Sequence, residues 1–393
     1  MSTLYGSTGS SLGGQRLTLS LPKSACAPRV GRASKLGIRC SSSTARPAAV
    51  IRDDDKEESR KYRRSVFNFE KWAKFRSTSR YYFAIKTIPE SRIVRSLFPA
   101  IFWVGGFSAL VGGYESAITD GLLPSYLPTF MLPNPTPQGL TSFALALLLV
   151  FRTNASYGRF DEARKMWGLL LNRGRDLQRQ VLTHRYAADQ DMEEFSARWI
   201  AAMGYSLMCH LRDDHDIREE VNDLLRPAEV EALAASEHRP LYCIQVLSTM
   251  VRSAEANEIE QLQMFQNLTT FEDILGGCER LLSTPVPLSY TRHTARFLLL
   301  WLTFLPFGLW TTIGWGMVPC NILVAALLLA IEEIGVQIEE PFGILALEGI
   351  CAKLRKNVHD LIDDAGSSEQ VFGDMKTMNE LFAAGANGTQ GMK

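Results

Sequence analysis

Four apolar stretches, arranged in two pairs, constrain the fold of this chain more than any other feature of its sequence. The first pair covers residues 97–118 and 139–151, and the second pair covers residues 295–315 and 318–337. An α-helix needs about 20 apolar residues to cross a bilayer, and three of the four stretches reach that length. The sequence therefore predicts an all-α membrane protein with four spans.

The second stretch is shorter than the others. Pro133, Pro135 and Pro137 precede it and are expected to prevent an earlier start of its helix. A short apolar helix at membrane depth is expected to be buried in protein or to line a cavity. Glu332 and Glu333 fall in the last turns of the fourth stretch, where carboxylates should face the bundle interior, a pore or the interface.

The distribution of Lys and Arg supports four spans. Basic residues lie before the first stretch, between the second and third, and after the fourth, whereas residues 119–138 and 314–317 contain none. Lys and Arg collect on the side from which a membrane protein is inserted. Both termini and the middle of the chain are therefore expected on one side, which is the stroma for a protein imported into a chloroplast.

Residues 1–52 contain eight Lys or Arg but no Asp or Glu, and they are rich in Ser, Thr, Ala and Gly. This composition is typical of an organelle transit peptide. The alternative is a basic arm that binds nucleic acid, but dense blocks of Lys and Arg are missing. The whole chain has 42 basic and 42 acidic residues, so removal of the eight leaves 34 basic residues and a mildly acidic chain. We therefore expect a protein that is imported into an organelle and has no nucleic-acid partner.

Residues 158–283 are polar but periodic, and strand signals are nearly absent. The pattern predicts a helix-bundle core rather than a cofactor site, in a soluble domain continuous with the membrane helices. The apolar residues at helical spacing are Phe160, Ala163, Trp167, Leu170, Leu171, Leu177, Val181, Phe195, Trp199, Met203, Ile259, Leu262, Leu268, Phe271 and Leu275. The expected divisions of the chain are a transit peptide or disordered segment (1–52), an N-terminal stromal segment (53–96), a transmembrane hairpin (97–157), a stromal helical domain (158–294), a second transmembrane hairpin (295–337), a C-terminal stromal helix (338–365) and a disordered tail (366–393).

Residues that could catalyse a reaction are not apparent. The sequence has no HExxH motif, no phosphate-binding glycine loop and no dinucleotide-binding fingerprint. The six His, among them His210, His215 and His293, stand apart in the sequence, and the seven Cys have neither CxxC spacing nor a His at ligand spacing. We therefore expect no enzyme, no zinc site, no disulfide framework and no cofactor, and we expect the cysteines to be small buried hydrophobic residues.

One pattern within the second stretch is more specific. Phe143, Leu147 and Phe151 repeat at positions i, i+4 and i+8, so they form a single apolar stripe on a helix. A stripe of this kind commonly packs against a neighbouring helix. Spacing alone therefore leaves ordinary helix packing as the alternative to a pore.

Three segments near these residues are recognisable. They read SFALALLLVFRTNASYGR at residues 142–159, GGCERLLSTPVPLSY at residues 276–290 and EEPFG at residues 339–343. The segments resemble the bestrophin family of anion channels, in particular its bacterial and chloroplast members, and the resemblance extends from about residue 67 to about residue 362. It implies a homopentamer around one central pore, whose second transmembrane helix lines a narrow hydrophobic neck.

The resemblance also implies roles for individual residues. The three neck residues of the family fall on the same stripe that the spacing reveals. A second constriction is implied at Val286, between two prolines that would break the helix and free backbone groups to face the pore. A simple bend between helices is the alternative for this segment. The residues expected near the pore are Arg152, Asn154, Pro285 and Pro287.

Animal members of the family bind calcium through an acidic run just after the PFG segment. Here the apolar residues ILAL follow Gly343, and Glu339 and Glu340 remain as the candidates for a metal. The alternative for these two carboxylates is a solvated pair at a helix end. Calcium gating is therefore not expected, and voltage or proton-motive force is the expected trigger, although no Arg-rich sensor helix is present.

These features together predict an anion channel of a chloroplast membrane, the thylakoid rather than the envelope, that conducts chloride passively. One short pore helix per chain cannot enclose a pore, so several copies must do so around an axis. The expected partners are chloride, membrane lipid and further copies of the chain. Bicarbonate is the alternative ion, because nothing in the neck distinguishes it from chloride. A non-conducting scaffold of the photosynthetic membrane is the alternative from another class.

Overall fold

The computed structural model describes residues 64–88, 92–124, 126–130, 132, 136–183, 190–213, 215–254 and 256–388. The chain divides into two units, Met1–Ile51 and Arg52–Lys393, and all described residues belong to the second. The transit-peptide prediction for residues 1–52 lies outside the described residues.

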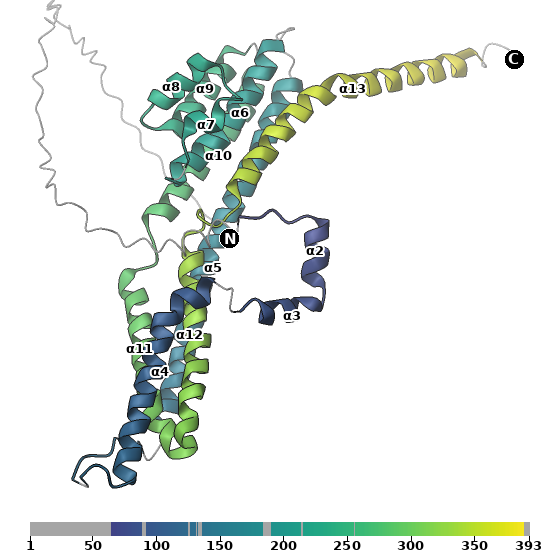
Figure 1. Ribbon diagram of the computed structural model, residues 1–393. Coiled ribbons are helices and arrows are strands. Elements are labelled where there is room, and N and C mark those ends of the chain that lie inside the picture. Colours follow the sequence, from purple (N-terminus) through teal and green to yellow (C-terminus); the bar gives the residue numbers. More distant parts are fainter. Residues whose placement is uncertain are drawn as a thin grey trace, which may run out of the picture. The chain divides into compact units, whose positions relative to one another are not determined.

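Every regular element among the described residues is a helix, which confirms the predicted all-α fold class (Figure 1). In chain order the elements are α2 (Phe69–Arg76), α3 (Ser79–Lys86), α4 (Arg92–Thr119), α5 (Thr136–Thr183), α6 (Gln190–Leu211), α7 (Ile217–Val221), α8 (Pro227–Ala235), α9 (Arg239–Ser253), α10 (Glu258–Ser283), α11 (Leu288–Ile313), η1 (Gly314–Gly316), α12 (Met317–Glu339) and α13 (Leu347–Gly388). One 3-10 turn, η1, joins α11 to α12.

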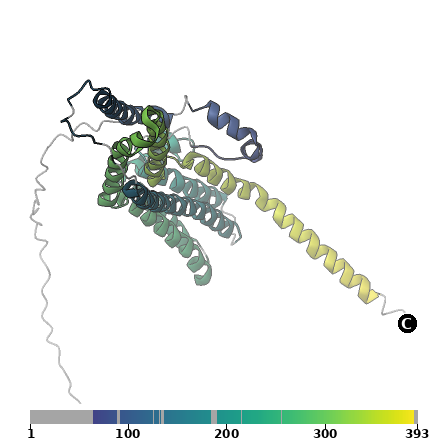
Figure 2. The ribbon, with the colours of Figure 1, turned by 90° about the horizontal axis from the view of Figure 1, so that it is seen from below.

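The apolar stretches form α4, the first part of α5, α11 and α12, which pack together, with α4 beside α12 in both Figure 1 and Figure 2. By length and composition, three helical runs among the described residues could cross a membrane, Ile93–Thr119, Thr136–Thr183 and Leu288–Glu339. The third run is divided into α11 and α12 at Gly314, whose positive φ of 52° suits a residue without a side chain. Their shared core contains Leu97, Val104, Leu145, Leu149, Leu298, Leu302, Ala325 and Leu329.

Helix α5 is longer than the sequence predicts. It begins at Thr136, so Pro137 lies in its first turn, and it continues for 48 residues without a break. Proline is tolerated in a first turn because the amide groups there have no partner within the helix. The expectation of a short second helix was therefore wrong, whereas the expected continuity between membrane helix and helical domain is confirmed.

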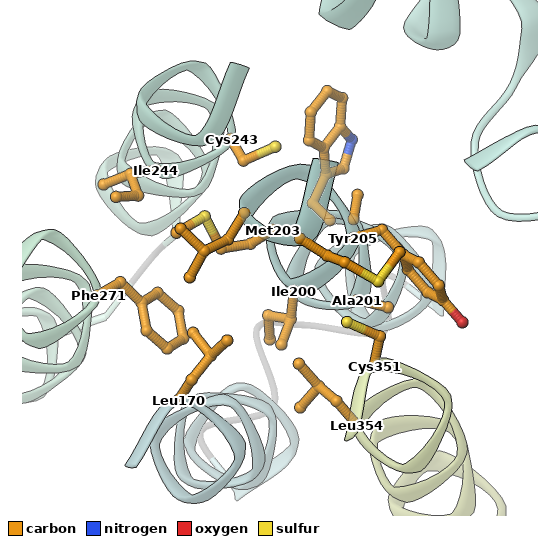
Figure 3. Packing of buried hydrophobic residues seen from close by; sticks show 14 of the residues in the cluster. Leu170, Ile200, Ala201, Met203, Tyr205, Cys243, Ile244, Phe271, Cys351 and Leu354 are labelled. Atoms are coloured by element: carbon orange, nitrogen blue, oxygen red, sulfur yellow. The ribbon is translucent and has the colours of Figure 1, made fainter. Parts of the chain in front are cut away.

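Helix α6 forms the centre of the polar domain, surrounded by α5, α9, α10 and α13 (Figure 3). Its residues Ile200, Met203 and Leu207 are fully buried. Gly174 of α5 lets three helices meet, because an added Cβ atom would lie 2.7 Å from Leu354 Cδ1 and 3.0 Å from Ile200 Cγ2. Although residues 158–283 are polar overall, the apolar faces of their helices pack closely into one continuous core.

The apolar stripes predicted for this domain are buried or partly buried, with two exceptions. Ile259 and Leu262, in the first turns of α10, are 71% and 58% exposed. The buried face of α10 instead follows Met264, Leu268 and Phe271, and the two exposed residues lie off that face because helical faces repeat every three or four residues.

The C-terminal helix differs from the prediction at both ends. Pro341 ends α12, and the turn that follows is closed by amides of Ile344 and Leu345 donating to the Pro341 carbonyl at 3.1 and 2.9 Å. Helix α13 therefore starts at Leu347 rather than at residue 338. It also continues to Gly388, so residues 366–388, expected in a disordered tail, are helical. They include Met, Glu, Leu and Ala, which favour helices.

Candidate functional site

The stripe of Phe143, Leu147 and Phe151 lies on an uncovered face of α5. These side chains are 74%, 43% and 56% exposed in the single chain, whereas Leu145 and Leu149, on the other face, are 2% and 3% exposed. Only the second face packs in the core shared with α4, α11 and α12. The structure thus places the three residues together on one helix face, and their function as a neck stays a prediction.

Polar residues follow the stripe directly. Asn154 is exposed and falls three residues after Phe151, on the same side of the helix. Arg152 is only 1% exposed, and its guanidinium group forms an ion pair with Glu332 of α12. Two of the residues expected near a pore therefore have different surroundings, because Asn154 faces outward and Arg152 is buried between helices.

The polar residues of α5 and α12 that lie near this ion pair in the sequence, here named the polar layer, are Arg152, Ser156, Glu332, Glu333 and Gln337; all are buried except Glu332, which is partly buried. The Gln337 Nε2 atom donates to Glu333 Oε1 at 2.8 Å, and Glu333 is 5% exposed. Of the expected surroundings, which were the bundle interior, a pore or the interface, Glu333 has the buried interior, and Glu332 is paired with Arg152 of α5. Within the described residues, Arg152 Nε and Nη2 and the Ser156 hydroxyl lack hydrogen-bond partners. Buried charge is costly unless it is paired, and ionisable residues inside membrane-spanning helices are rare and commonly functional. The polar layer is therefore part of the candidate functional site.

The segment between α10 and α11 contains Pro285, Val286 and Pro287. Both prolines are exposed and Val286 is half-buried. Since proline has no amide hydrogen, Val286 has the single backbone donor of these three residues, and it donates to Glu339 Oε1 at 3.0 Å. Glu339 is therefore not a solvated carboxylate at a helix end, because it holds the loop that contains Val286 against the end of α12.

Arg159 holds the same loop from the other side. It lies on α5 and donates from Nε to the Glu339 carbonyl at 2.9 Å, from Nη1 to the Thr284 carbonyl at 2.7 Å and from Nη2 to the Leu281 carbonyl at 2.5 Å. One guanidinium group thus joins α5, α10 and α12. Arg159 is eight residues beyond Phe151 on one continuous helix, a rise of about 12 Å. Arg159 therefore connects the helix that contains the stripe to the loop that contains Val286.

The EEPFG segment is fixed by a second buried arginine. Arg212 donates from Nε to the Phe342 carbonyl at 2.8 Å and from Nη2 to the Leu345 carbonyl at 2.6 Å, and its Nη1 contacts Glu348 Oε1 at 2.5 Å. Arg64 also donates to Glu348, at 3.1 Å. Burial opposes ionisation of Glu348, but a backbone hydrogen bond and these two arginines outweigh it and hold its pKa below the usual value.

Comparison with known proteins assigns the family. Residues 72–360 match a family model described as Bacterial/Fungal Bestrophin protein. The chain belongs to the bestrophin family. It is 36% identical over 323 residues to the protein named voltage-dependent chloride channel 2, chloroplastic, of Arabidopsis thaliana, across 81% of this chain and 77% of that protein. A voltage-dependent anion channel-forming protein of Ralstonia nicotianae is 35% identical over 256 residues, across 63% of this chain and 83% of the relative.

Solved structures of the family share this fold. A bacterial bestrophin homologue from Klebsiella pneumoniae superposes with a TM-score of 0.61 at 25% sequence identity, and the match covers 67% of this chain and 98% of that chain. The residues matched by the bestrophin family model include α5, the Val286 loop and the EEPFG segment, which are the parts joined by Arg159 and Arg212.

Sequence reasoning missed three features of this bestrophin. The roles of Arg159 and Arg212 depend on partners far along the chain, and no spacing pattern marks them. The histidines stand apart in the sequence, but His210 and His238 converge on Glu279 in the fold. Within the described parts of the chain, these three residues form the group of His, Cys, Asp and Glu side chains whose geometry could hold a metal ion. Glu339 and Glu340 do not belong to it.

The cysteines behave as predicted where they are described. Cys209, Cys243, Cys278 and Cys351 are buried, and Cys320 is partly buried. Burial raises the pKa of the Cys243 and Cys278 thiols to about 12. These thiols are therefore protonated and unreactive at neutral pH.

Proposed function

We propose that this bestrophin is an anion-selective channel that conducts chloride passively across a chloroplast membrane. The observation that supports this function best is the uncovered apolar stripe on α5. The same helix continues with Arg152 of the polar layer and with Arg159, which holds the Val286 loop. The names of the relatives, chloride channels of a chloroplast and anion channel-forming proteins of bacteria, point in the same direction.

In this proposal, copies of the chain form a ring, a homopentamer, with the stripes facing the axis. One helix face cannot enclose a pore, and closed rotational symmetry is the usual solution. The exposure of Phe143 and Phe151 in a single chain supports such an arrangement, because an uncovered apolar face needs lipid, another protein surface or a dewetted pore beside it. The proposal assigns the stripe to the pore.

The neck acts as a barrier that wets and dries. Its apolar side chains cannot replace the hydration water of an ion, so conduction requires water to enter the neck. The edges of Phe143 and Phe151 carry the positive end of the ring quadrupole, and ring edges turned inward would attract a weakly hydrated anion. Glu332 compensates the charge of Arg152, so the proposed selectivity does not depend on this arginine as a charged filter.

The second constriction is proposed at Val286. Arg159 and Glu339 hold the loop on two sides, so the position of Val286 is set by contacts with α5 and α12. Because the Glu339 carboxylate accepts the Val286 amide, we propose that it positions the aperture rather than binding calcium. Voltage or proton-motive force is the proposed trigger of opening.

The proposed location is a chloroplast membrane, with the thylakoid preferred to the envelope. Two proteins of Arabidopsis thaliana that are 36% and 35% identical to this chain are named chloroplastic, and residues 1–52 have the composition of a transit peptide. N-terminal sequencing of protein isolated from plastids tests the proposal and should give a mature end between about residues 40 and 55. An intact Met1 would contradict it. Separation of thylakoid from envelope membranes, followed by immunoblotting, tests the preferred membrane.

Planar-bilayer recording of the purified full chain tests the function. A chloride gradient should give currents that reverse near the chloride equilibrium potential, and a scaffold would give no conductance. Replacement of chloride by bicarbonate in the same recording decides between the two ions, because the shift of reversal potential reports the permeability ratio. Reversal at the cation equilibrium potential would refute anion selectivity.

A further inference from the structure

Three residues from three separate elements meet on the helical domain. His210 is the penultimate residue of α6, His238 precedes the first residue of α9, and Glu279 lies in the last two turns of α10. The rings of His210 and His238 are 4.8 Å apart between centroids. One carboxylate oxygen of Glu279 lies 2.8 Å from His210 Nε2 and 3.0 Å from His238 Nε2.

The ligand types select a class of metal. Two imidazoles and one carboxylate are preferred ligands of zinc and related divalent transition metals, whereas calcium and magnesium prefer oxygen ligands alone. One potential ligand atom from each residue lies within 4.8 Å of the other two. Tetrahedral zinc with bonds of about 2.0 to 2.1 Å places its ligand atoms roughly 3.3 Å apart. The two short separations therefore need to open by only about 0.3 to 0.5 Å.

The group is also accessible. The side chains of His210, His238 and Glu279 are 31%, 39% and 39% exposed. An ion can therefore enter from solvent, and water can complete the coordination as a fourth ligand. Other histidine–carboxylate contacts in the described chain lack this convergence, since His215 contacts Glu220 and Glu348 without a second imidazole.

We propose that His210, His238 and Glu279 bind one zinc-class divalent metal ion per chain. The ion would join the end of α6, the start of α9 and the last turns of α10. Glu279 is four residues before the end of α10 and six residues before Pro285. The site would therefore stabilise the end of the helix that leads into the Val286 loop.

Metal binding to the full chain in detergent tests this proposal. Tag-free protein is stripped with chelator, loaded with zinc chloride, freed of excess metal by gel filtration and measured by mass spectrometry for zinc. We expect one zinc ion per chain. His238→Ala and Glu279→Gln should each weaken zinc binding by at least about tenfold. Cobalt(II) loading of the unaltered chain should produce the intense visible absorption of a tetrahedral site.

His359→Ala is the matched control, because His359 is an exposed histidine on α13 whose ring contacts only the Arg355 carbonyl among the described residues. It should retain zinc and the cobalt spectrum. Zinc should also raise the thermal midpoint of the unaltered chain and of His359→Ala but not of His238→Ala. Size-exclusion chromatography verifies that each variant is folded.

Two results would overturn the proposal. Failure of the unaltered chain to retain zinc or to show the cobalt absorption would reduce the group to two imidazoles that share a carboxylate, and this readout does not depend on any variant. Equal zinc retention by His238→Ala, Glu279→Gln and His359→Ala would place the bound metal elsewhere. Neither result depends on channel activity, so the metal site and the proposed channel can fail separately.

Discussion

Truncation of Phe143 to Ala should open the proposed neck at little cost to folding. Phe143 is 74% exposed in the single chain, so only about a quarter of its surface is covered by its own chain. Removal of a fully buried Phe side chain costs about 3 to 5 kcal/mol. Scaled by the covered quarter, the loss from Phe143→Ala is about 1 kcal/mol. In a ring of copies, however, the substitution removes one aromatic ring from every chain at the same level of the pore.

Leu145→Ala is the matched control, two residues away on the same helix. Leu145 is 2% exposed and packs in the core with α4, α11 and α12, so its truncation should cost about 2 to 5 kcal/mol. Phe143→Ala should therefore keep its oligomer and raise conductance or open time, because water stays in a wider neck. Leu145→Ala should lower the thermal midpoint in detergent and the yield of oligomer.

Size-exclusion chromatography and bilayer recording on the same samples distinguish a gate from ordinary helix packing. Combined replacement of Phe143, Leu147 and Phe151 should enlarge the effect of the single variant on conductance. An intact oligomer with unchanged currents would refute the assignment of this stripe as the gate. If Phe143→Ala lost the oligomer to the same degree as Leu145→Ala, the stripe would be assigned to ordinary helix packing instead of the gate.

Four further predictions follow from the contacts and charges described above. Arg159→Lys should lower the unfolding free energy by about 2 to 4 kcal/mol, because Lys cannot reach three carbonyls at once; thermal unfolding in detergent checks this, and an unchanged midpoint would contradict it. Glu348 has a lowered pKa in the folded chain. Its stabilising effect is therefore present above the pKa that Glu348 has in the unfolded chain, and it is lost as pH falls through the pKa that Glu348 has in the folded chain. In a plot of thermal midpoint against pH, Glu348→Gln should therefore show a smaller fall of the midpoint at acidic pH than the unaltered chain. Cys243 and Cys278 should resist maleimide at pH 8 in the folded chain and react after unfolding, because burial raises their pKa to about 12. Protease added to the stromal face should cleave the helical domain and spare residues 119–138, and the reverse pattern would overturn the predicted orientation.

The family and the helical fold could be predicted from sequence because their signals are local. The apolar stretches and the periodic stripes depend on residues within one helix, so spacing is sufficient to identify them. The face shared by Phe143, Leu147 and Phe151 follows from the helical repeat alone. The three motif segments identified the family for the same reason, since each is a short continuous run of residues.

The lengths of the helices were harder to predict. The three prolines before residue 139 suggested a late start for α5, but the helix begins at Thr136 and accommodates Pro137 in its first turn. Ile259 and Leu262 fit a helical period and are nevertheless exposed. The first error arises because proline is tolerated in the first turn of a helix. The second arises because a helical period alone does not determine which face is buried.

The tertiary structure alone decided how the site is held together. Arg159 and Glu339 are 180 positions apart in sequence, and Val286 and Glu339 are 53 apart, yet they form one network. His210 and His238 reach Glu279 across 69 and 41 positions. No periodicity relates residues at such separations, because folding of the helices into a bundle determines which ends lie side by side. Sequence by itself thus determined the elements and the family of this bestrophin, and packing of those elements decided which charged side chains meet.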